Sequence, residues 1–148
     1  MATSLAKPLP DSSDIDNAIV AVLGSDLQLL ALMPDGVYID HAPPGAQRFV
    51  ILSIVQATDE PVFGGRAFED VLYMIEPRAL STTGGNVKDA AARIQALLED
   101  VPLTVAGFVW MTTHRDGRQP ERVEQDEVDP AIRWLRRGAY YRVQMAIA

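Results

Sequence analysis

Apolar residues recur at helical spacing in three stretches of the chain. The first stretch follows an i, i+3, i+4, i+7, i+8 pattern and predicts a helix over residues 14–23. A shorter helix is expected over residues 26–33, before a Pro-Asp-Gly turn. The third helix begins after Asn86, an N-cap residue followed by Asp89 in the first turn, and Pro102 ends it. Its expected inward stripe is Val87, Ala91, Ile94, Leu97, Leu98 and Val101.

Other stretches have the pattern of strands. Residues 49–57 are almost wholly apolar, which predicts a central strand covered on both faces. Residues 67–76 alternate, so we expect them to pair antiparallel with that strand across a polar connection over 58–66. The expected strands are residues 37–39, 49–57, 67–76, 108–113 and 139–147. This order predicts an α+β fold with one largely antiparallel sheet of four to five strands and two to three helices packed on it.

The chain has 148 residues, 48% of them apolar and 22% charged, which indicates one ordinary globular domain. We expect residues 1–13, with Pro8 and Pro10, to form a flexible lead and residues 14–148 to form the domain. The apolar runs are too short to span a bilayer, and the first residues do not have the pattern of a signal peptide. The sequence therefore predicts no membrane partner and assembly in the cytoplasm.

Charge is distributed unevenly along the chain. Residues 1–75 hold ten acids and three bases, which accounts for the whole net charge of −7. Residues 76–148 hold ten acids and ten bases, nine of them arginine. Arginine favours planar, bidentate contacts. The chain has neither the basic stripe nor the high isoelectric point of a sequence-specific nucleic-acid binder.

Sequence motifs for catalysis are absent. The chain has no cysteine, and its two histidines, His41 and His114, lack the spacing of a zinc site. The acidic stretch 121–129 does not have the calcium-loop pattern, and the Gly-Gly before Asn86 does not fit a phosphate-binding loop. We therefore predict no catalytic residue, no cofactor and no metal. A small enzyme or ligand-binding domain that uses His41, His114 and the acidic loop remains an alternative.

Some residues suit contacts with other proteins. Trp134 stands among arginines before the last strand, where it either forms a binding hot spot or anchors the long polar loop over 114–130 to the core. Phe63 lies beside two glycines and Arg66, as either an exposed docking tip or a side chain folded back on its own sheet.

Several segments resemble the tail terminator, or tail completion, proteins of long-tailed bacteriophages. The segment Gly36–Ala46 (GVYIDHAPPGA), the buried strand FVILSIV and the amphipathic helix DAAARIQALLED carry the resemblance, together with the closing segment Arg137–Met145 (RGAYYRVQM). The resemblance covers nearly all of residues 14–147. Arg48 departs from it, because the family often has a proline at that place.

The resemblance implies a non-enzymatic virion protein at the tail–neck junction. Proteins that this chain resembles form a ring of six subunits at the head-proximal end of the tail tube. The ring stops tube polymerisation and joins the tail to the head. The implied partners are further copies of the chain, the tail tube protein and a head-completion or neck protein, with DNA passing non-specifically through the lumen. Another neck component, such as a head-closure or connector protein, is the alternative from the same class.

For the ring, the expected contact residues fall into two groups. Phe63, Arg66, Arg115 and Arg118 are predicted to touch ring neighbours, the tube or the neck. Trp134, Arg136 and Arg137 are predicted to form the subunit–subunit contact.

Overall fold

The computed structural model describes residues 12–62, 65–81, 86–119, 121–126 and 128–147. Those residues form three helices and seven strands: α1 (Ser12–Gly24), α2 (Leu27–Leu32), β1 (Val37–Ile39), β2 (Arg48–Val62), β3 (Gly65–Leu80), α3 (Val87–Leu98), β4 (Phe108–Arg118), β5 (Arg122–Gln125), β6 (Arg133–Arg136) and β7 (Ala139–Ile147). The expected lead over residues 1–13 lies outside the described residues, apart from the first two residues of α1.

The strands form one open sheet. β1 pairs parallel with β2, and β2 forms a long antiparallel hairpin with β3. Two strands then pair with β3 in turn: β7 along residues 68–75 and β6 along residues 78–80. β4 lies outside β7, and β5 lies outside β6. The predicted α+β architecture is confirmed, but the sheet has more strands than expected and carries one parallel pair.

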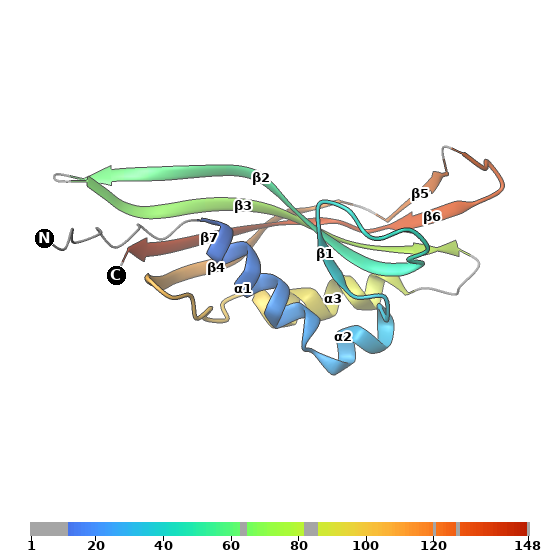
Figure 1. Ribbon diagram of the computed structural model, residues 1–148, viewed down its shortest axis with the longest axis horizontal. Coiled ribbons are helices and arrows are strands. Elements are labelled where there is room, and N and C mark those ends of the chain that lie inside the picture. The colour runs from blue at the N-terminus through green and yellow to red at the C-terminus, as the bar shows by residue number, and fades with distance from the viewer. Residues whose placement is uncertain (1–11, 63–64, 82–85, 120, 127, 148) are drawn as a thin grey trace, which may run out of the picture.

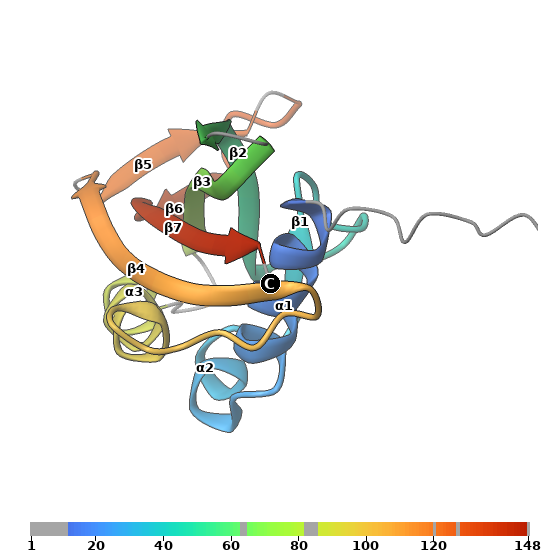
Figure 2. The same cartoon turned by 90° about the vertical axis from the view of Figure 1, so that its left-hand side faces the viewer.

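All three helices lie on one face of the sheet (Figure 1; Figure 2). Ile15, Ile19 and Leu23, one turn apart along α1, are fully buried against it. Asp16, also on α1, accepts a hydrogen bond from the Tyr73 hydroxyl of β3. Burial and this bond raise the pKa of Tyr73, so the phenol stays protonated and holds α1 to the sheet.

Helix α3 starts as predicted and ends earlier. The Asn86 side chain accepts a hydrogen bond from the Asp89 amide at 3.0 Å, which confirms the expected cap. The helix ends at Leu98, so Val101 lies beyond it and is 37% exposed. The cause is Asp100, which has a φ of 57° and donates its amide to the Thr113 carbonyl at 2.8 Å. The buried face of the helix consists of Val87, Ala90, Ile94 and Leu98.

The hairpin of β2 and β3 is longer than the sequence predicts. Most of the expected connection over 58–66 is paired strand, because β2 runs to Val62 and β3 starts at Gly65. The prediction that this strand is covered on both faces is wrong for the second half of β2, where Ile54 and Val55 are 43% and 51% exposed. The reason is that the hairpin extends past the helix layer (Figure 1), so only the first half of β2 has helices packed on it.

The expected long loop over 114–130 is also mostly strand. β4 continues to Arg118, and β5 and β6 form a second, shorter hairpin. We call β5, β6 and the described residues between them, 126 and 128–132, the arm, and residues 126 and 128–132 its tip. The arm projects beyond the helices at one end of the sheet and curls away from the helix layer (Figure 1; Figure 2).

Candidate interaction surfaces

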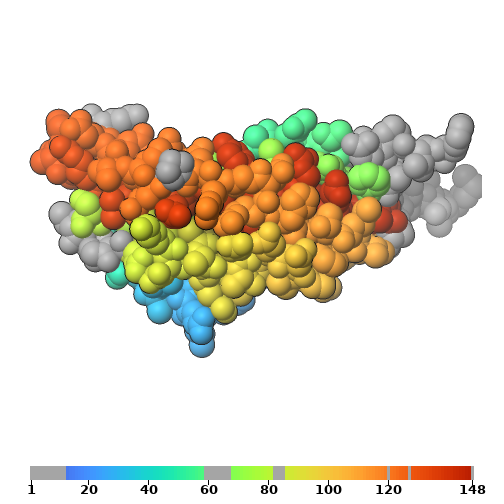
Figure 3. Space-filling view, turned by 180° about the vertical axis from the view of Figure 1, so that it is seen from behind, coloured from blue at the N-terminus to red at the C-terminus, as the bar shows by residue number. Residues whose placement is uncertain are grey.

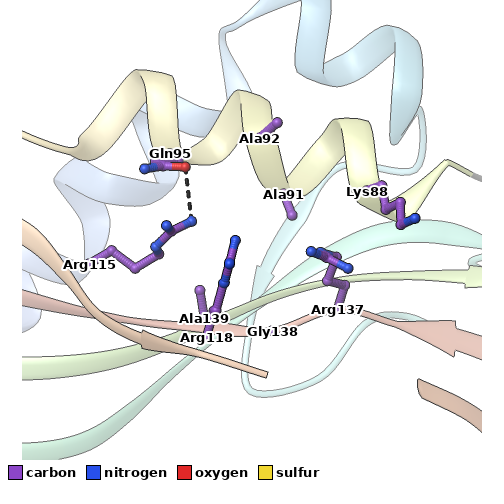
Figure 4. A pocket seen from close by; sticks show the side chains of 9 residues that line it. All are labelled: Lys88, Ala91, Ala92, Gln95, Arg115, Arg118, Arg137, Gly138 and Ala139. Carbon is purple, nitrogen blue, oxygen red and sulfur yellow. Dashed lines mark hydrogen bonds between the residues drawn. The ribbon is translucent and has the colours of Figure 1, made fainter. Parts of the chain in front are cut away.

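A cationic pocket lies between α3 and the sheet, with a cavity volume of about 100 Å³. Four bases line it, from three parts of the fold: Lys88 on α3, Arg115 and Arg118 on β4, and Arg137 between β6 and β7. Their side chains gather around the same hollow (Figure 4). Seen from behind, α3 and β4 lie side by side on the surface that contains it (Figure 3). The remaining lining residues are Ala91, Ala92, Gln95, Gly138 and Ala139.

Helix α3 and the β6–β7 junction create the space for these bases. Ala91 and Ala92 are small, and they lie one helical turn from both Lys88 and Gln95. Gly138 lets the junction approach β3, because a Cβ there would lie 2.9 Å from the Met74 sulfur and 3.1 Å from a Glu76 oxygen. The Gln119 amide donates to the Gly138 carbonyl at 2.7 Å, which ties the end of β4 to the start of β7.

Within the residues that the structure describes, Arg115 is the one base of the pocket whose side chain forms a hydrogen bond with another side chain. Its guanidinium donates to the Gln95 side-chain oxygen at 2.9 Å (Figure 4). Opposite Arg115 on β7, burial raises the pKa of Tyr141 to about 12, although the positive charge of Arg115 acts against the rise. The tyrosine therefore stays neutral and does not compensate the bases.

Carboxylates do not neutralise the rest of the pocket. Within the described ranges, no carboxylate forms an ion pair with Lys88, Arg118 or Arg137. Elsewhere the chain pairs its arginines closely: Arg93 meets Asp26 at 2.7 Å, and Arg142 meets Asp70 at 2.6 Å. The pocket is thus a place where positive charge is left available for an anionic partner.

Trp134 and Arg136 attach the arm to β2 and β3. The Trp134 ring packs edge-to-face on Phe49, with centroids 5.7 Å apart, and its Nε1 donates to Asp126 at 3.3 Å. The Arg136 guanidinium donates to Glu76 at 2.8 Å and also to Glu124. The structure therefore favours the anchoring role for Trp134. The Trp134 indole N–H and the Arg136 guanidinium both have partners within the chain.

Glu76 is the buried centre of this network. It is 1% exposed, and its Oε1 accepts from the Nε of Arg78 at 2.6 Å as well as from Arg136. Arg122 lies 3.6 Å from its other oxygen. Three guanidiniums around one buried carboxylate stabilise its charge and join β3, β5 and β6.

The tip of the arm is an acidic turn held by hydrogen bonds. One oxygen of Asp126 accepts from the amides of Val128 and Asp129, both at 3.1 Å. These amides, the Asp129 amide most strongly, and the Trp134 indole lower the pKa of Asp126. The Ile132 amide donates to the Asp129 carbonyl at 3.0 Å and closes the turn. Val128 is nevertheless 92% exposed, so the turn presents an apolar side chain beside carboxylates.

Of the seven residues that the sequence singled out, the structure brings Arg115, Arg118 and Arg137 together. Phe63 lies outside the described residues, and for Arg66 the structure describes only backbone pairing with Pro61. Lys88 and Gln95 were missed by the sequence prediction. Lys88 and Gln95 lie two helical turns apart with Ala91 and Ala92 between them. This spacing of polar and small residues indicates a helix face that is not packed into the core.

The two histidines do not form a site together. His41 follows β1 at one edge of the sheet, whereas His114 lies on β4 at the other edge, beyond β2, β3 and β7. In the part of the chain that the structure describes, no group of three His, Asp or Glu residues could hold a metal ion. Among the same residues, no helix has the length and apolarity needed to cross a membrane.

Comparison with known proteins identifies a family and a fold. The family model "Tail completion protein gp17" matches residues 17–129. A solved chain from the "Virion of native gene transfer agent (GTA) particle" has a TM-score of 0.71 and 19% identity, covering 91% of this chain and 96% of that one. A second solved structure has a TM-score of 0.53 and 16% identity, covering 90% and 95%. No curated protein sequence matches the chain.

Proposed function

Because this chain belongs to the tail completion protein gp17 family, we propose that it forms a ring at the head-proximal end of a phage tail tube. The family places it among structural components of the virion tail. In the proposal the ring has six subunits, stops tube polymerisation and joins the tail to the neck. Its partners are further copies of the chain, the tube protein and a head-completion protein.

The observation that carries the proposal is the family match over residues 17–129, which spans most of the domain. The described surface supports it in one further respect. A closed ring of identical subunits needs two different patches that face each other across each interface. The chain offers a basic pocket between α3 and the sheet and, separately, an acidic tip on the arm.

The open edge of the sheet suits assembly as well. In the described part of the chain β4 pairs only with β7, so the outer side of Phe108–Arg118 has no strand beside it. Val109 and Met111 on this strand are 56% and 45% exposed. Strands with an unpaired edge and apolar side chains pair readily with other proteins.

We also propose that DNA passes through the lumen without being held. The acidic excess of residues 1–75 would repel phosphate if those residues face the channel. A map of the ring in which these acids lie on its outer rim would contradict this part of the proposal.

Electron cryo-microscopy of purified tails tests the proposal directly. We expect one ring of six copies directly on the last ring of tube protein. A ring found instead between the head and another completion protein, without contact to the tube, would support the alternative of a neck component and overturn the terminator role.

A further inference from the structure

We infer that the tip of the arm of one copy docks into the cationic pocket of the next copy. This inference rests on the proposed ring and assigns its subunit contact to named side chains. The pocket side is Lys88, Arg115, Arg118 and Arg137, and the tip side is the acidic turn around Asp126 and Asp129.

The pocket has the chemistry and size for carboxylates. Guanidiniums bind carboxylate oxygens in a planar, two-bond geometry, and these charge-assisted bonds are among the strong ones. A cavity of about 100 Å³ has room for a carboxylate group with a methylene or two. The Gln95 side chain accepts from Arg115 and donates to Glu99, so it fixes the Arg115 guanidinium in place at the pocket and leaves the carboxylate-binding role to the bases.

The tip has the complementary chemistry and is shaped before it binds. Its turn is fixed by Asp126 and by the bond from the Ile132 amide to the Asp129 carbonyl. A preformed turn loses less conformational entropy on docking than a loose loop. Val128, with 92% of its surface exposed, would gain from contact with Ala91 and Ala92 on the pocket wall.

The tip does not reach the pocket of its own copy. The pocket lies at the foot of the arm, on the helix side of the sheet, where Arg118 and Arg137 flank β5 and β6. The arm leaves that foot in the opposite direction (Figure 1; Figure 2), and four extended residues carry the tip roughly 13 Å away. Tip and pocket can therefore meet only between copies, and a contact between two unlike patches gives a ring when its rotation closes, as the proposed six-subunit assembly requires.

Disulfide trapping in assembled particles tests the contact, and the chain contains no cysteine that would interfere. Val128→Cys and Ala91→Cys are combined in one chain, which keeps every charged group in place. The chain is supplied to phage that lack the wild-type gene. We expect a ladder of covalent multimers of this chain on non-reducing gels, which reductant collapses to the monomer.

The matched control pairs Val128→Cys with Thr58→Cys, an exposed position on β2 outside the pocket. This control and both single variants should stay monomeric. Absence of the ladder, or cross-linking only to a different virion protein, would overturn the docking inference. Tail length in the same particles is the separate readout of the proposed function, so normal tails without a ladder would reject the docking alone.

Charge exchange gives a second test with an independent readout. Arg118→Glu with Arg137→Glu should lower the yield of infectious particles at least about tenfold, the loss expected for removing charged hydrogen bonds. Adding Asp129→Arg should restore part of that yield. The variant with Arg118→Lys and Arg137→Lys keeps the positive charges, so its yield of infectious particles should fall less. Equal losses in the Glu and Lys variants, with no rescue, would contradict the ion pairing.

Discussion

Single side chains hold the arm to the body of the protein, and Glu76 is the most informative. Its carboxylate oxygens face three arginines, Arg78, Arg122 and Arg136, which lie far apart in the sequence. Nothing in the local sequence marks it as the centre of a charge network. Its role comes from the register, which places Arg78 opposite Arg136.

Removing the charge of Glu76 should destabilise the protein. Glu76→Gln leaves the partly buried Arg78 without its anion and Arg136 with Glu124 alone, and the expected loss in the free energy of unfolding is about 2–4 kcal/mol. Urea denaturation measures it. Glu124→Gln is the control, because that carboxylate is 56% exposed and should contribute about 1 kcal/mol or less. Equal effects of the two variants would contradict a buried centre.

At the scale of elements, the ionic contact between α2 and α3 stabilises the helix layer. Asp26 caps α2 through the Leu29 amide at 2.9 Å and accepts two hydrogen bonds from Arg93 of α3. The bond from Arg93 is the largest cause that lowers the pKa of Asp26 to about 2. Because the folded-state pKa lies below the ordinary value, the ionised form stabilises the fold.

This contact predicts a pH dependence of stability. The contribution of Asp26 should be complete above about pH 4 and should disappear as the pH falls through about 2. Asp26→Asn should therefore lower the melting temperature at pH 6, and its difference from the wild type should shrink toward pH 2. Asp40→Asn, in an exposed loop with a φ of 65° that Asn tolerates, is the control. A difference that is constant from pH 6 to pH 2 would rule out the ionic contribution.

The sequence predicted the helices better than the strands, for physical reasons. Helix spacing and caps are local, so α1 and the Asn86 cap could be predicted from a few residues. The arm could not, because RVEQ and RWLR contain no apolar alternation and become strands through cross-strand charge pairs such as Arg136 with Glu124. The pocket was predicted in part: Arg115, Arg118 and Arg137 were candidates, but only the fold adds Lys88.

At the scale of the whole molecule, charge governs how copies are expected to meet. The chain carries −7 in total, yet three of its bases lack a carboxylate partner in the described ranges and gather in one pocket. Copies of an acidic protein repel one another unless such a patch is matched with acids. If the tip docks into the pocket as proposed, this arrangement orients neighbours in one direction and disfavours back-to-back pairs.

Assembly should consequently depend on salt. If the tip and the pocket join through ion pairs that remain partly exposed, raising salt from about 0.1 M to 1 M shortens the Debye length from about 10 Å to 3 Å and weakens the ring. We expect isolated rings, measured by mass photometry, to dissociate at the higher concentration. The Arg118→Lys, Arg137→Lys variant should dissociate at lower salt than the wild type. Rings that grow more stable with salt would indicate an apolar contact instead.

The proposed function can be tested most directly through the length of tails made without this protein. Particles assembled with its gene removed are examined by negative-stain electron microscopy, and tube lengths are measured beside those of the wild type. The account predicts tubes of excessive and variable length that are not attached to filled heads. Tubes of normal length, or particles that remain infectious, would contradict a role in ending the tail.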